Sequence, residues 1–506
     1  MFKIKISDIL INKKYLLVYF ISLLFFLAIF YRFSNFYYIK FHFLNLLIIF
    51  IGGSFALIYY SKTKNLHRTC FIILLIFGLV MILTTPSFIV CDEIEHYARS
   101  DLTAQGILFP EYINNEGYNV SSNFNHLLAI RGSSILDPAI FNDNVAENHS
   151  LFNGCFPQNP FYPYLLSGLG ILLAKLLNLS DIFSMYIGRF LNLLFYCVIC
   201  SFAIKKATEY KLPIFLVSCI PLCLYQAASF NVDGFIISMT LLAIAYFINI
   251  YKSEIVSNKD LGVFFALILL VSLLKLPYVL LVLLIFLIKK DRFTSKRVYL
   301  ISRIIPIIII IVCAVYSYNA SKLLKYTIRN DHFIEHHVNP GNQFVNMINH
   351  PHHTFVLFSS IFAFTQDMIW DLFRFSYEKW TCASKLLASL YFVFFTLFTV
   401  TYNTVKIKFK RNYKIFLAFI LLVIYIGIIF IQYLSWAPFA YPRLDMNIGV
   451  YSRYYLPLFA FLPLVFSPER IMSKLKIDNY ELKVILGCLI FLSGTIIFTL
   501  SVIYKF

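Results

Sequence analysis

The sequence predicts an all-α protein that crosses a membrane many times, and three observations support this prediction. First, 60% of the 506 residues are hydrophobic and only 13% are charged, which leaves more apolar surface than one soluble core can bury. Second, several apolar runs approach the length that spans a bilayer. Third, most Lys and Arg residues fall in short blocks between these runs. The net charge of +18 therefore reflects membrane topology, and no nucleic-acid partner is expected.

The basic blocks set the predicted orientation of the chain. Basic segments beside transmembrane spans are enriched on the cytoplasmic side, so these blocks and the N-terminus are expected there. The segment 86–160 holds nine Asp or Glu residues, two Arg and no Lys, and is expected on the outer side together with 318–383 and 437–452. The basic blocks lie at residues 3–14, 62–68, 205–211, 289–303, 406–414 and 470–483.

Keeping every basic block on one side predicts about 11–13 transmembrane helices. Two further apolar stretches, 161–178 and 344–372, are expected to lie as helices on the outer interface, because a full span at either place would export a basic block. The first apolar run lacks a small-residue cleavage site and is expected to be a retained span. The expected spans lie at residues 15–31, 43–60, 69–86, 183–204, 212–228, 235–251, 261–274, 276–288, 300–317, 384–404, 414–436, 453–468 and 483–503.

The densest cluster of ionisable groups is the stretch CDEIEHYARS at residues 91–100. It directly follows an expected span, so it stands at the outer membrane surface. If it begins a helix, the spacing places Asp92, Glu95, His96 and Arg99 on one face. The same spacing also fits an exposed interfacial helix that is held by carboxylate–arginine pairs.

The residue types in this stretch suit acid–base chemistry. Partial desolvation at a membrane surface raises the basicity of a carboxylate, which makes Asp92 or Glu93 a candidate general base. His96 and Arg99 are candidates for orienting that carboxylate or for binding an anion. Asp92, Glu93 and His96 could also bind a divalent metal ion, although their spacing identifies none.

Three cations and a tyrosine are candidates for binding an anionic lipid group. Lys275 interrupts an apolar run at the junction of two expected spans, and Arg189 lies in the outer part of another. Arg453 opens a span from the outside, with Tyr454 beside it. Cations at this depth often mark a phosphate site. Snorkelling of the lysine and anchoring of the tyrosine in the aromatic belt explain the same positions without a ligand.

Two further features leave their roles open. The histidine-rich run at 331–353 has enough side chains to bind a metal ion but no recognised spacing, so an exported polar loop that contacts sugar or headgroups is preferred. Cys91 and Cys155 bracket the first outer loop and could form a disulfide, but spacing alone does not establish that they meet.

Several stretches, always in the expected order, together resemble one family. It is the DUF2142 family of bacterial polytopic membrane proteins, which in turn resembles the GT-C class of membrane glycosyltransferases. The resemblance covers about residues 70–470, and its most specific part is the Asp-Glu-x-x-His-x-x-Arg core. The stretches are PSFIVCDEIEHYARSDLTAQG, NPFYPYLLSGLGILLAKLL, GRFLNLLFY, AASFNVDGFIIS, LLKLPYVLL and GVYSRYYLPLF.

The resemblance implies a GT-C-like bundle. Residues 69–470 would form its core module, residues 1–68 would add two spans in front, and residues 471–506 would form a cytoplasmic segment and the last span. It also implies that an acidic residue in the first outer loop acts as base on an acceptor hydroxyl, while basic residues hold the phosphate of a polyprenyl-phosphate donor. Asp92 is the first choice for the base, and Glu93 is the second.

We therefore expect an enzyme of a bacterial cytoplasmic membrane, surrounded by membrane lipids. It would transfer a sugar from a polyprenyl-phosphate carrier to a glycan or lipid acceptor of the cell envelope on the outer face. One alternative is an envelope polysaccharide polymerase or ligase, which would depend on Arg and His and not on a carboxylate base. Another is a non-catalytic transporter of lipid or polysaccharide, a class that usually carries mid-span charges and internal repeats.

Overall fold

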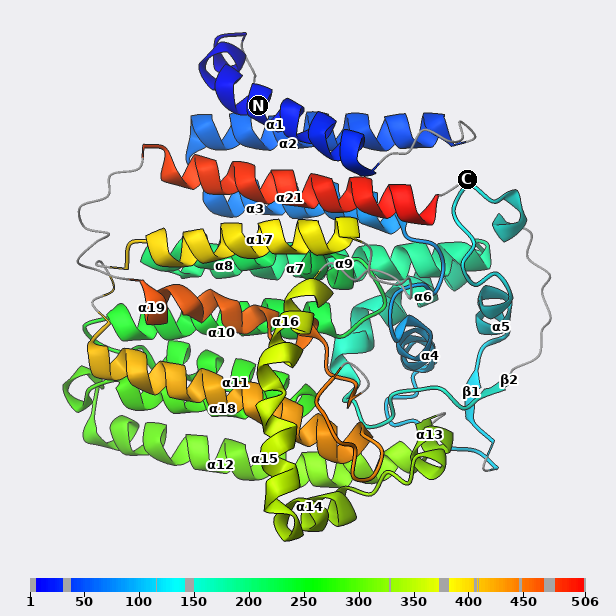
Figure 1. Ribbon diagram of the computed structural model, residues 1–506, viewed down its shortest axis with the longest axis vertical. Coiled ribbons are helices and arrows are strands. Elements are labelled where there is room, and N and C mark those ends of the chain that lie inside the picture. The colour runs from blue at the N-terminus through cyan, green and yellow to red at the C-terminus, as the bar shows by residue number, and fades with distance from the viewer. Residues whose placement is uncertain are drawn as a thin grey trace.

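The computed structural model confirms an all-α protein with many membrane-spanning helices. It describes residues 6–30, 38–114, 116–141, 150–326, 329–372, 382–404, 407, 409–445, 448–467 and 478–504. Long helices lie side by side, and short helices and two strands gather at one end of them (Figure 1). The strands are β1 (Tyr118–Val120) and β2 (Ser150–Phe152), which pair antiparallel.

Nine helices among the described residues are long and apolar enough to cross a bilayer. Two shorter helices, α8 (Lys211–Ser218) and α9 (Pro221–Ala227), meet at an angle of 76° and make a tenth crossing if they count together as one broken span. The break precedes Pro221, whose missing N–H cannot continue the helix. The nine helices are α1 (Ile6–Phe30), α2 (Ile39–Thr63), α3 (Leu66–Thr84), α7 (Asp181–Lys206), α10 (Asp233–Lys252), α12 (Lys296–Ser321), α17 (Cys382–Thr401), α18 (Arg411–Trp436) and α21 (Tyr480–Ile503).

Three expected spans are too short or too divided to count as full-length crossings, which explains why the described residues hold fewer of them than the expected 11–13. One is a helix of 17 residues, one is a 3-10 helix, and one is divided into three short pieces. Prolines stand in the first turns of η4, η9 and α19 and restrict the backbone there. These elements are α11 (Asn258–Leu274), η4 (Leu276–Leu287), η8 (Ser452–Tyr454), η9 (Leu456–Phe461) and α19 (Leu462–Phe466).

The short helix α11 ends inside the bundle. It starts at the same level as α12, because Val256 and Phe293, which closely precede the two helices, pair in a short bridge. At 1.5 Å per residue, the 17 residues of α11 rise about 26 Å and the 26 residues of α12 rise about 39 Å. Measured along the helix axes from this common level, the turn at Lys275 therefore falls about 13 Å short of the far end of α12.

Connections that carry basic blocks meet at the other end of the bundle. The Lys206 ammonium lies 3.0 Å from the carboxylate of Asp260 at the start of α11. The hydroxyl of Tyr402 donates a hydrogen bond of 2.8 Å to the backbone oxygen of Glu209. The charge pattern predicted that these connections share one side, and their contacts agree with that grouping.

The segment after α3 forms a small helical cap, made of residues 86–141 and 150–176, over one end of the bundle (Figure 1). The buried carboxylate of Asp101 joins its parts: it accepts hydrogen bonds of 2.8 Å from the backbone N–H and the hydroxyl of Ser121, and it lies 2.9 Å from the Lys175 ammonium. The helices of the cap are α4 (Glu93–Ala104), α5 (Ser122–Ala129) and α6 (Leu165–Leu176), with 3-10 turns η1 (Pro138–Phe141) and η2 (Tyr162–Tyr164).

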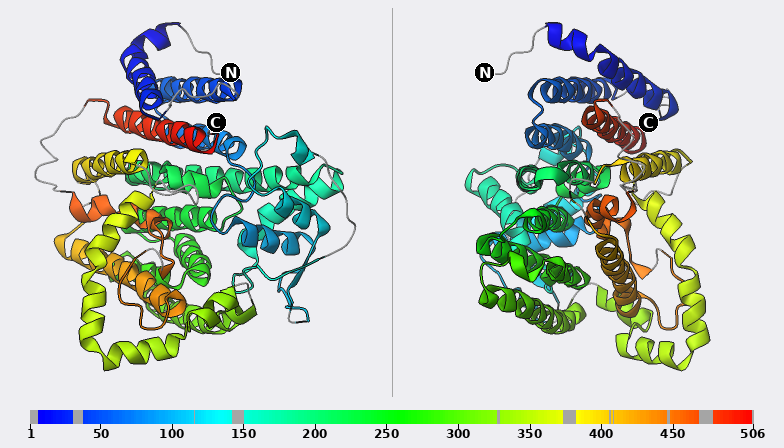
Figure 2. Two further views of the ribbon diagram at one scale, coloured as in Figure 1. Left: turned by 45° about the vertical axis from the view of Figure 1, so that its right-hand side comes forward. Right: turned by 90° about the vertical axis from the view of Figure 1, so that its left-hand side faces the viewer.

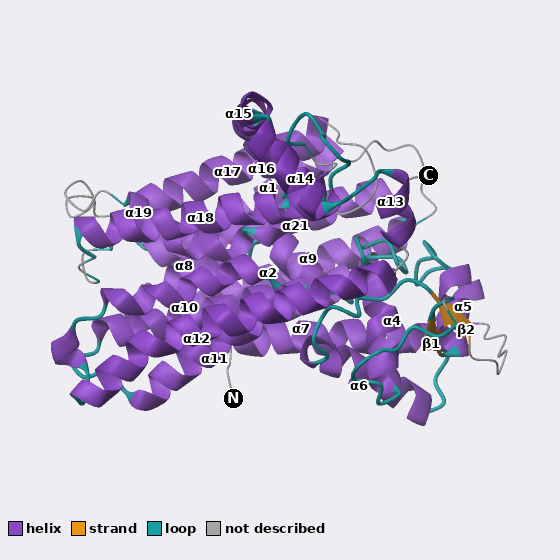
Figure 3. Ribbon diagram, turned by 90° about the horizontal axis from the view of Figure 1, so that it is seen from below, coloured by secondary structure: helices purple, strands orange, loops and turns teal. Residues whose placement is uncertain are grey.

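Neither expected interfacial stretch forms a helix of span length. The first holds the 12-residue α6, and the second is divided into short helices that run across the side of the bundle (Figures 1 and 3). Phe355 and Phe362 are 74% and 85% exposed there, which fits contact with lipid. The short helices after α12 are η6 (Lys322–Tyr326), α13 (Arg329–Glu335), α14 (Pro340–Asn349), α15 (Pro351–Ser359) and α16 (Ile361–Asp371); the connections near the basic end hold η3 (Thr208–Tyr210) and η5 (Lys290–Arg292).

The N-terminal helices α1 and α2 stand at one edge of the bundle, and α12 and α14 stand at the opposite edge (Figure 2). The chain thus begins with two helices that lie away from the centre of the bundle. They pack against α3 and α21, and the Tyr19 hydroxyl of α1 lies 2.7 Å from the Ser493 hydroxyl of α21.

Two glycines allow the cap to approach the bundle closely. A Cβ on Gly170 of α6 would lie 2.6 Å from the Cα of Gly188 on α7, and a Cβ on Gly188 would lie 2.1 Å from the ring of Phe230. Since real Cβ atoms do not approach other atoms this closely, both positions exclude a side chain unless the helices separate.

Substitution Gly170→Val is expected to destabilise the protein by about 1–3 kcal/mol, because the overpacked helices must move apart. The measurement is the unfolding temperature of purified protein in detergent. The matched control is Gly262→Ala in α11, where an added Cβ meets nothing within 4 Å. Equal unfolding temperatures for both variants would contradict this account of the helix contact.

Candidate functional site

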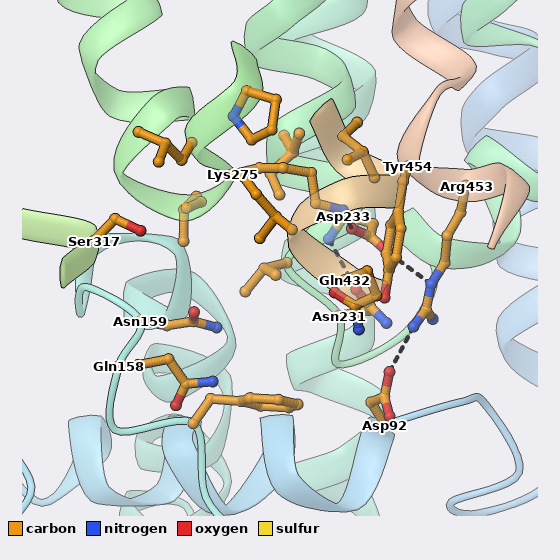
Figure 4. A pocket seen from close by; sticks show the side chains of 18 of the residues that line it. Asp92, Gln158, Asn159, Asn231, Asp233, Lys275, Ser317, Gln432, Arg453 and Tyr454 are labelled. Carbon is orange, nitrogen blue, oxygen red and sulfur yellow. Dashed lines mark hydrogen bonds and ion pairs between the residues drawn. The ribbon is translucent and has the colours of Figure 1, made fainter. Parts of the chain in front are cut away.

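A cavity of about 270 Å³ opens where the shortened segments meet the cap. The α9–α10 connection, the α11–η4 turn and η8 line it from the bundle, and the start of α4 lines it from the cap. Its wall includes many polar side chains, although it adjoins the apolar interior. The polar residues that line it are Asp92, His96, Gln158, Asn159, Asn231, Asp233, Lys275, Ser317, Gln432, Arg453 and Tyr454, most of them labelled in Figure 4.

Arg453 is the centre of an ion-pair network in this wall (Figure 4). Its Nη2 lies 2.5 Å from Oδ2 of Asp92, and its Nε lies 3.1 Å from Oδ2 of Asp233. The other oxygen of Asp233 lies 4.0 Å from Nζ of Lys275. Two carboxylates and two cations therefore alternate along the wall. Arg453 and Asp233 are only 6% and 5% exposed, so removing one partner would leave a buried charge uncompensated.

The short helix η8 is held from several sides. Nζ of Lys275 lies 3.1 Å from the centre of the Tyr454 ring, a cation–π contact that stabilises by up to about 2 kcal/mol when desolvated. The hydroxyl of Tyr278 donates to the backbone oxygen of Tyr454 at 2.8 Å, and the backbone N–H of Ser452 donates to Asp371 at 2.8 Å. These contacts fix the position of the arginine between them.

Asp92 directs its carboxylate into the cavity through an unusual backbone conformation. The residue directly precedes α4, and its φ is +63° in the left-handed region, which costs about 1–2 kcal/mol for a residue with a side chain. Its side chain does not cap the helix, although aspartate is a favoured capping residue. With 24% of its side chain exposed, it is the most accessible charge of the network.

Two nitrogens of the Arg453 guanidinium lack a hydrogen bond. Nε and Nη1 are buried and make none within the described part of the chain, although Nε lies 3.1 Å from Oδ2 of Asp233. An unsatisfied buried donor costs about 1–3 kcal/mol, and native structures rarely keep one without a reason. The Nη1 donor is therefore a candidate contact for an acceptor from a ligand.

A family model described as a predicted membrane protein, DUF2142, matches residues 75–462. The chain belongs to the DUF2142 family. This confirms the predicted membership, and the match includes every residue of the ion-pair network. No curated protein and no solved structure matches the chain.

Glu93 and Arg189 of this DUF2142 chain do not line the cavity; they form a fully buried ion pair with each other. Arg189 donates to both oxygens of Glu93, at 2.8 and 2.7 Å, and also to the backbone oxygens of Thr85 and Pro86. The backbone N–H of Phe230 donates to Glu93 at 3.1 Å. Because both carboxylate oxygens are already bonded, we assign Glu93 and Arg189 a structural role, contrary to their expected roles as base and phosphate contact.

Arg99 also has a structural role in the DUF2142 chain. It lies on α4 as predicted but is 1% exposed, and it donates to the hydroxyl of Thr103 at 3.1 Å and to the backbone oxygen of Leu108 at 2.8 Å. Its guanidinium therefore closes the turn after α4 and is not available to a ligand in the cavity. His96 does line the cavity: Nδ1 lies 3.0 Å from the Tyr164 hydroxyl, and the ring stacks on Phe156.

The expected metal and disulfide alternatives find no support in the geometry. Within the described ranges, no group of three or more His, Cys, Asp or Glu side chains is arranged to hold a metal ion. In the histidine-rich run, His332 instead stacks on the ring of Trp436. Cys91 and Cys155 form no disulfide, and burial raises the pKa of the Cys155 thiol to about 12.

Sequence reasoning missed Asp233, the carboxylate that joins the two cations. It lies within AASFNVDGFIIS, one of the stretches that carried the family resemblance. Its position at the start of a span resembles an ordinary helix beginning, because acidic residues are favoured in a first turn. The sequence did contain a signal for Asp233: a carboxylate this close to an expected span needs a counter-charge.

We expect Glu93→Gln to destabilise the protein by about 3–5 kcal/mol, because Arg189 would stay buried without its counter-charge. The double variant Glu93→Gln/Arg189→Gln should recover part of this loss, since neither position would then hold a buried charge without a counter-charge. Unfolding temperature in detergent measures both effects, and Asp260→Asn is the matched control at an ion pair with two partly exposed side chains. A fully stable Glu93→Gln protein that had lost function would return Glu93 to the list of catalytic candidates.

Proposed function

We propose that this DUF2142 protein is a GT-C-like glycosyltransferase. It transfers a sugar from a polyprenyl-phosphate donor to a hydroxyl of a cell-envelope glycan or lipid, on the outer face of a bacterial cytoplasmic membrane. The observation that carries the proposal is the network of Asp92, Arg453, Asp233 and Lys275 in the wall of a cavity between membrane helices and cap.

The cation side of the network suits the phosphate of the donor. Arg453 has a buried N–H without an acceptor, and a guanidinium can bind two phosphate oxygens at once. Lys275 adds a second positive charge beside it. Apolar side chains of η4 and α18, including Pro277, Ile428 and Ile431, line the same cavity and suit the lipid chain next to the phosphate.

Asp92 is suited to act as the base. In the reaction, the acceptor oxygen bonds to the anomeric carbon while its proton passes to the Asp92 carboxylate. The bond between the anomeric carbon and the phosphate oxygen breaks, and its electron pair leaves with the lipid phosphate. Arg453 and Lys275 stabilise the charge of that leaving group. Since Arg453 forms an ion pair with Asp92 in the structure, a phosphate that binds Arg453 also weakens this ion pair.

The location of the cavity favours a lipid-linked donor. It lies between the cap and the membrane helices, at the end of the bundle away from the basic connections. With those connections in the cytoplasm, the cavity faces the outer side, which cytoplasmic nucleotide sugars do not reach. A sugar carried across the membrane on a lipid phosphate is available there.

We expect Asp92→Asn to lower sugar transfer by a factor of about 10²–10⁴ while donor binding is kept, because only the proton acceptor is lost. Arg453→Gln and Lys275→Met should instead weaken binding of the polyprenyl-phosphate donor. Transfer and binding are measured on purified protein in liposomes, and Asp260→Asn, an ion-paired carboxylate near the basic end, is the matched control.

Two outcomes would contradict the proposal. If Asp92→Asn transfers sugar normally while Arg453→Gln abolishes transfer, a polymerase or ligase mechanism replaces it. If the liposomes show movement of lipid across the bilayer without a glycan product, the protein is a transporter. In cells, the surface glycans of a deletion strain that is complemented with wild type or with Asp92→Asn provide the corresponding test.

A further inference from the structure

The cavity has an uncharged polar side in addition to its charged one. Gln158 and Asn159 belong to the loop before α6, and Ser317 lies near the end of α12. Figure 4 shows these three side chains away from Asp92 and Arg453, with the space between the two groups. We call Gln158, Asn159 and Ser317 the amide wall.

The amide wall has hydrogen-bonding groups that the protein does not use. The side-chain amide of Gln158 and the hydroxyl of Ser317 make no hydrogen bond to any described residue; the Gln158 oxygen is buried, and its nitrogen points toward the space (Figure 4). Asn159 donates from Nδ2 to the Tyr164 hydroxyl at 2.8 Å, which leaves its Oδ1 available. Amides and hydroxyls both donate and accept, as the hydroxyls of a sugar also do.

These groups are held in place before a ligand binds. The hydroxyl of Tyr316, next to Ser317, donates to the backbone oxygen of Gln158 at 3.0 Å and so joins the loop to α12. The Tyr164 hydroxyl, which accepts the hydrogen bond from Asn159, also lies 3.0 Å from Nδ1 of His96 on α4. The wall is therefore connected to both the cap and the bundle, which reduces the entropy lost on binding.

The charges of the cavity restrict the ligand that this wall can accept. Lys275 and Arg453 balance Asp92 and Asp233, so a bound phosphate makes the site net negative. A further carboxylate on the ligand would meet the amide wall, which offers it no cation, and burying such a charge without a partner is costly. The wall therefore favours an uncharged ring over a uronic acid.

The size of the cavity restricts the ligand further. Its volume of about 270 Å³ is slightly below the usual range of ligand pockets, about 300–1,000 Å³. This space suits one sugar ring next to a phosphate and not an oligosaccharide.

We infer that the amide wall binds the transferred unit and selects a single uncharged monosaccharide, such as a hexose or an N-acetylhexosamine, on the lipid phosphate. This inference rests on the proposed function, because the phosphate site beside it fixes where the sugar lies. Gln158 is the residue on which selection depends most, since its side-chain amide makes no hydrogen bond to another described residue and its nitrogen points toward the space (Figure 4).

The test is a binding measurement in nanodiscs with three probes: a polyprenyl phosphate alone, the same lipid carrying glucose, and the same lipid carrying glucuronic acid. Glucose and glucuronic acid differ only at C6, where a hydroxymethyl group is replaced by a carboxylate. We expect the glucose lipid to bind at least tenfold more tightly than the glucuronic acid lipid. Gln158→Ala should weaken binding of the glucose lipid about three- to tenfold, the loss typical of one hydrogen bond, and leave binding of the unmodified lipid unchanged.

The controls separate this inference from the proposed function. Asn319→Ala removes an exposed amide two residues beyond Ser317 and should change none of the three affinities. Equal affinities for the glucose and glucuronic acid lipids, or no effect of Gln158→Ala on the glucose lipid, would overturn the inference while the phosphate site stands. Failure of the wild-type protein to bind the unmodified polyprenyl phosphate would overturn the proposed function itself.

Discussion

The buried ion pair between Glu93 and Arg189 is the contact on which the rest of the site depends. Through one guanidinium and one carboxylate it joins the end of α3, the start of α4 and the α9–α10 connection. Asp92 directly precedes Glu93, and Asp233 follows Phe230 by three residues. The pair therefore sets the positions of both carboxylates that contact Arg453. An ion pair outside the cavity thus fixes the positions of charges in the cavity wall.

Much of the fold followed from simple patterns in the sequence. Apolar runs predicted most of the long helices, and the basic blocks predicted which connections share one end of the bundle. The number of full crossings was harder to predict, because it depends on the length of each continuous helix. Prolines restrict the backbone around Pro277 and Pro457, so the helical segments there are short. The break before Pro221 likewise depends on a proline, which a hydrophobicity pattern does not take into account.

The candidate site was predicted in part. One cavity is lined by five of the predicted site residues, which the sequence had placed at the outer ends of expected spans: Asp92, His96, Lys275, Arg453 and Tyr454. Asp92 and Glu93 have the same chemistry and adjacent positions, so only the left-handed backbone at Asp92 and the bonds of Arg189 separate their roles. Ordinary helical spacing placed residues on a face but could not say which cation would meet which carboxylate.

The short helix α11 also has a consequence for the lipid environment of the protein. Because its turn lies about 13 Å below the end of α12, the charged network lies deeper than the tips of the longest helices. If the proposed lipid donor binds here, its phosphate has to pass below the tip of α12 to reach the network. The length of α11 then sets how deeply the donor must enter between the helices.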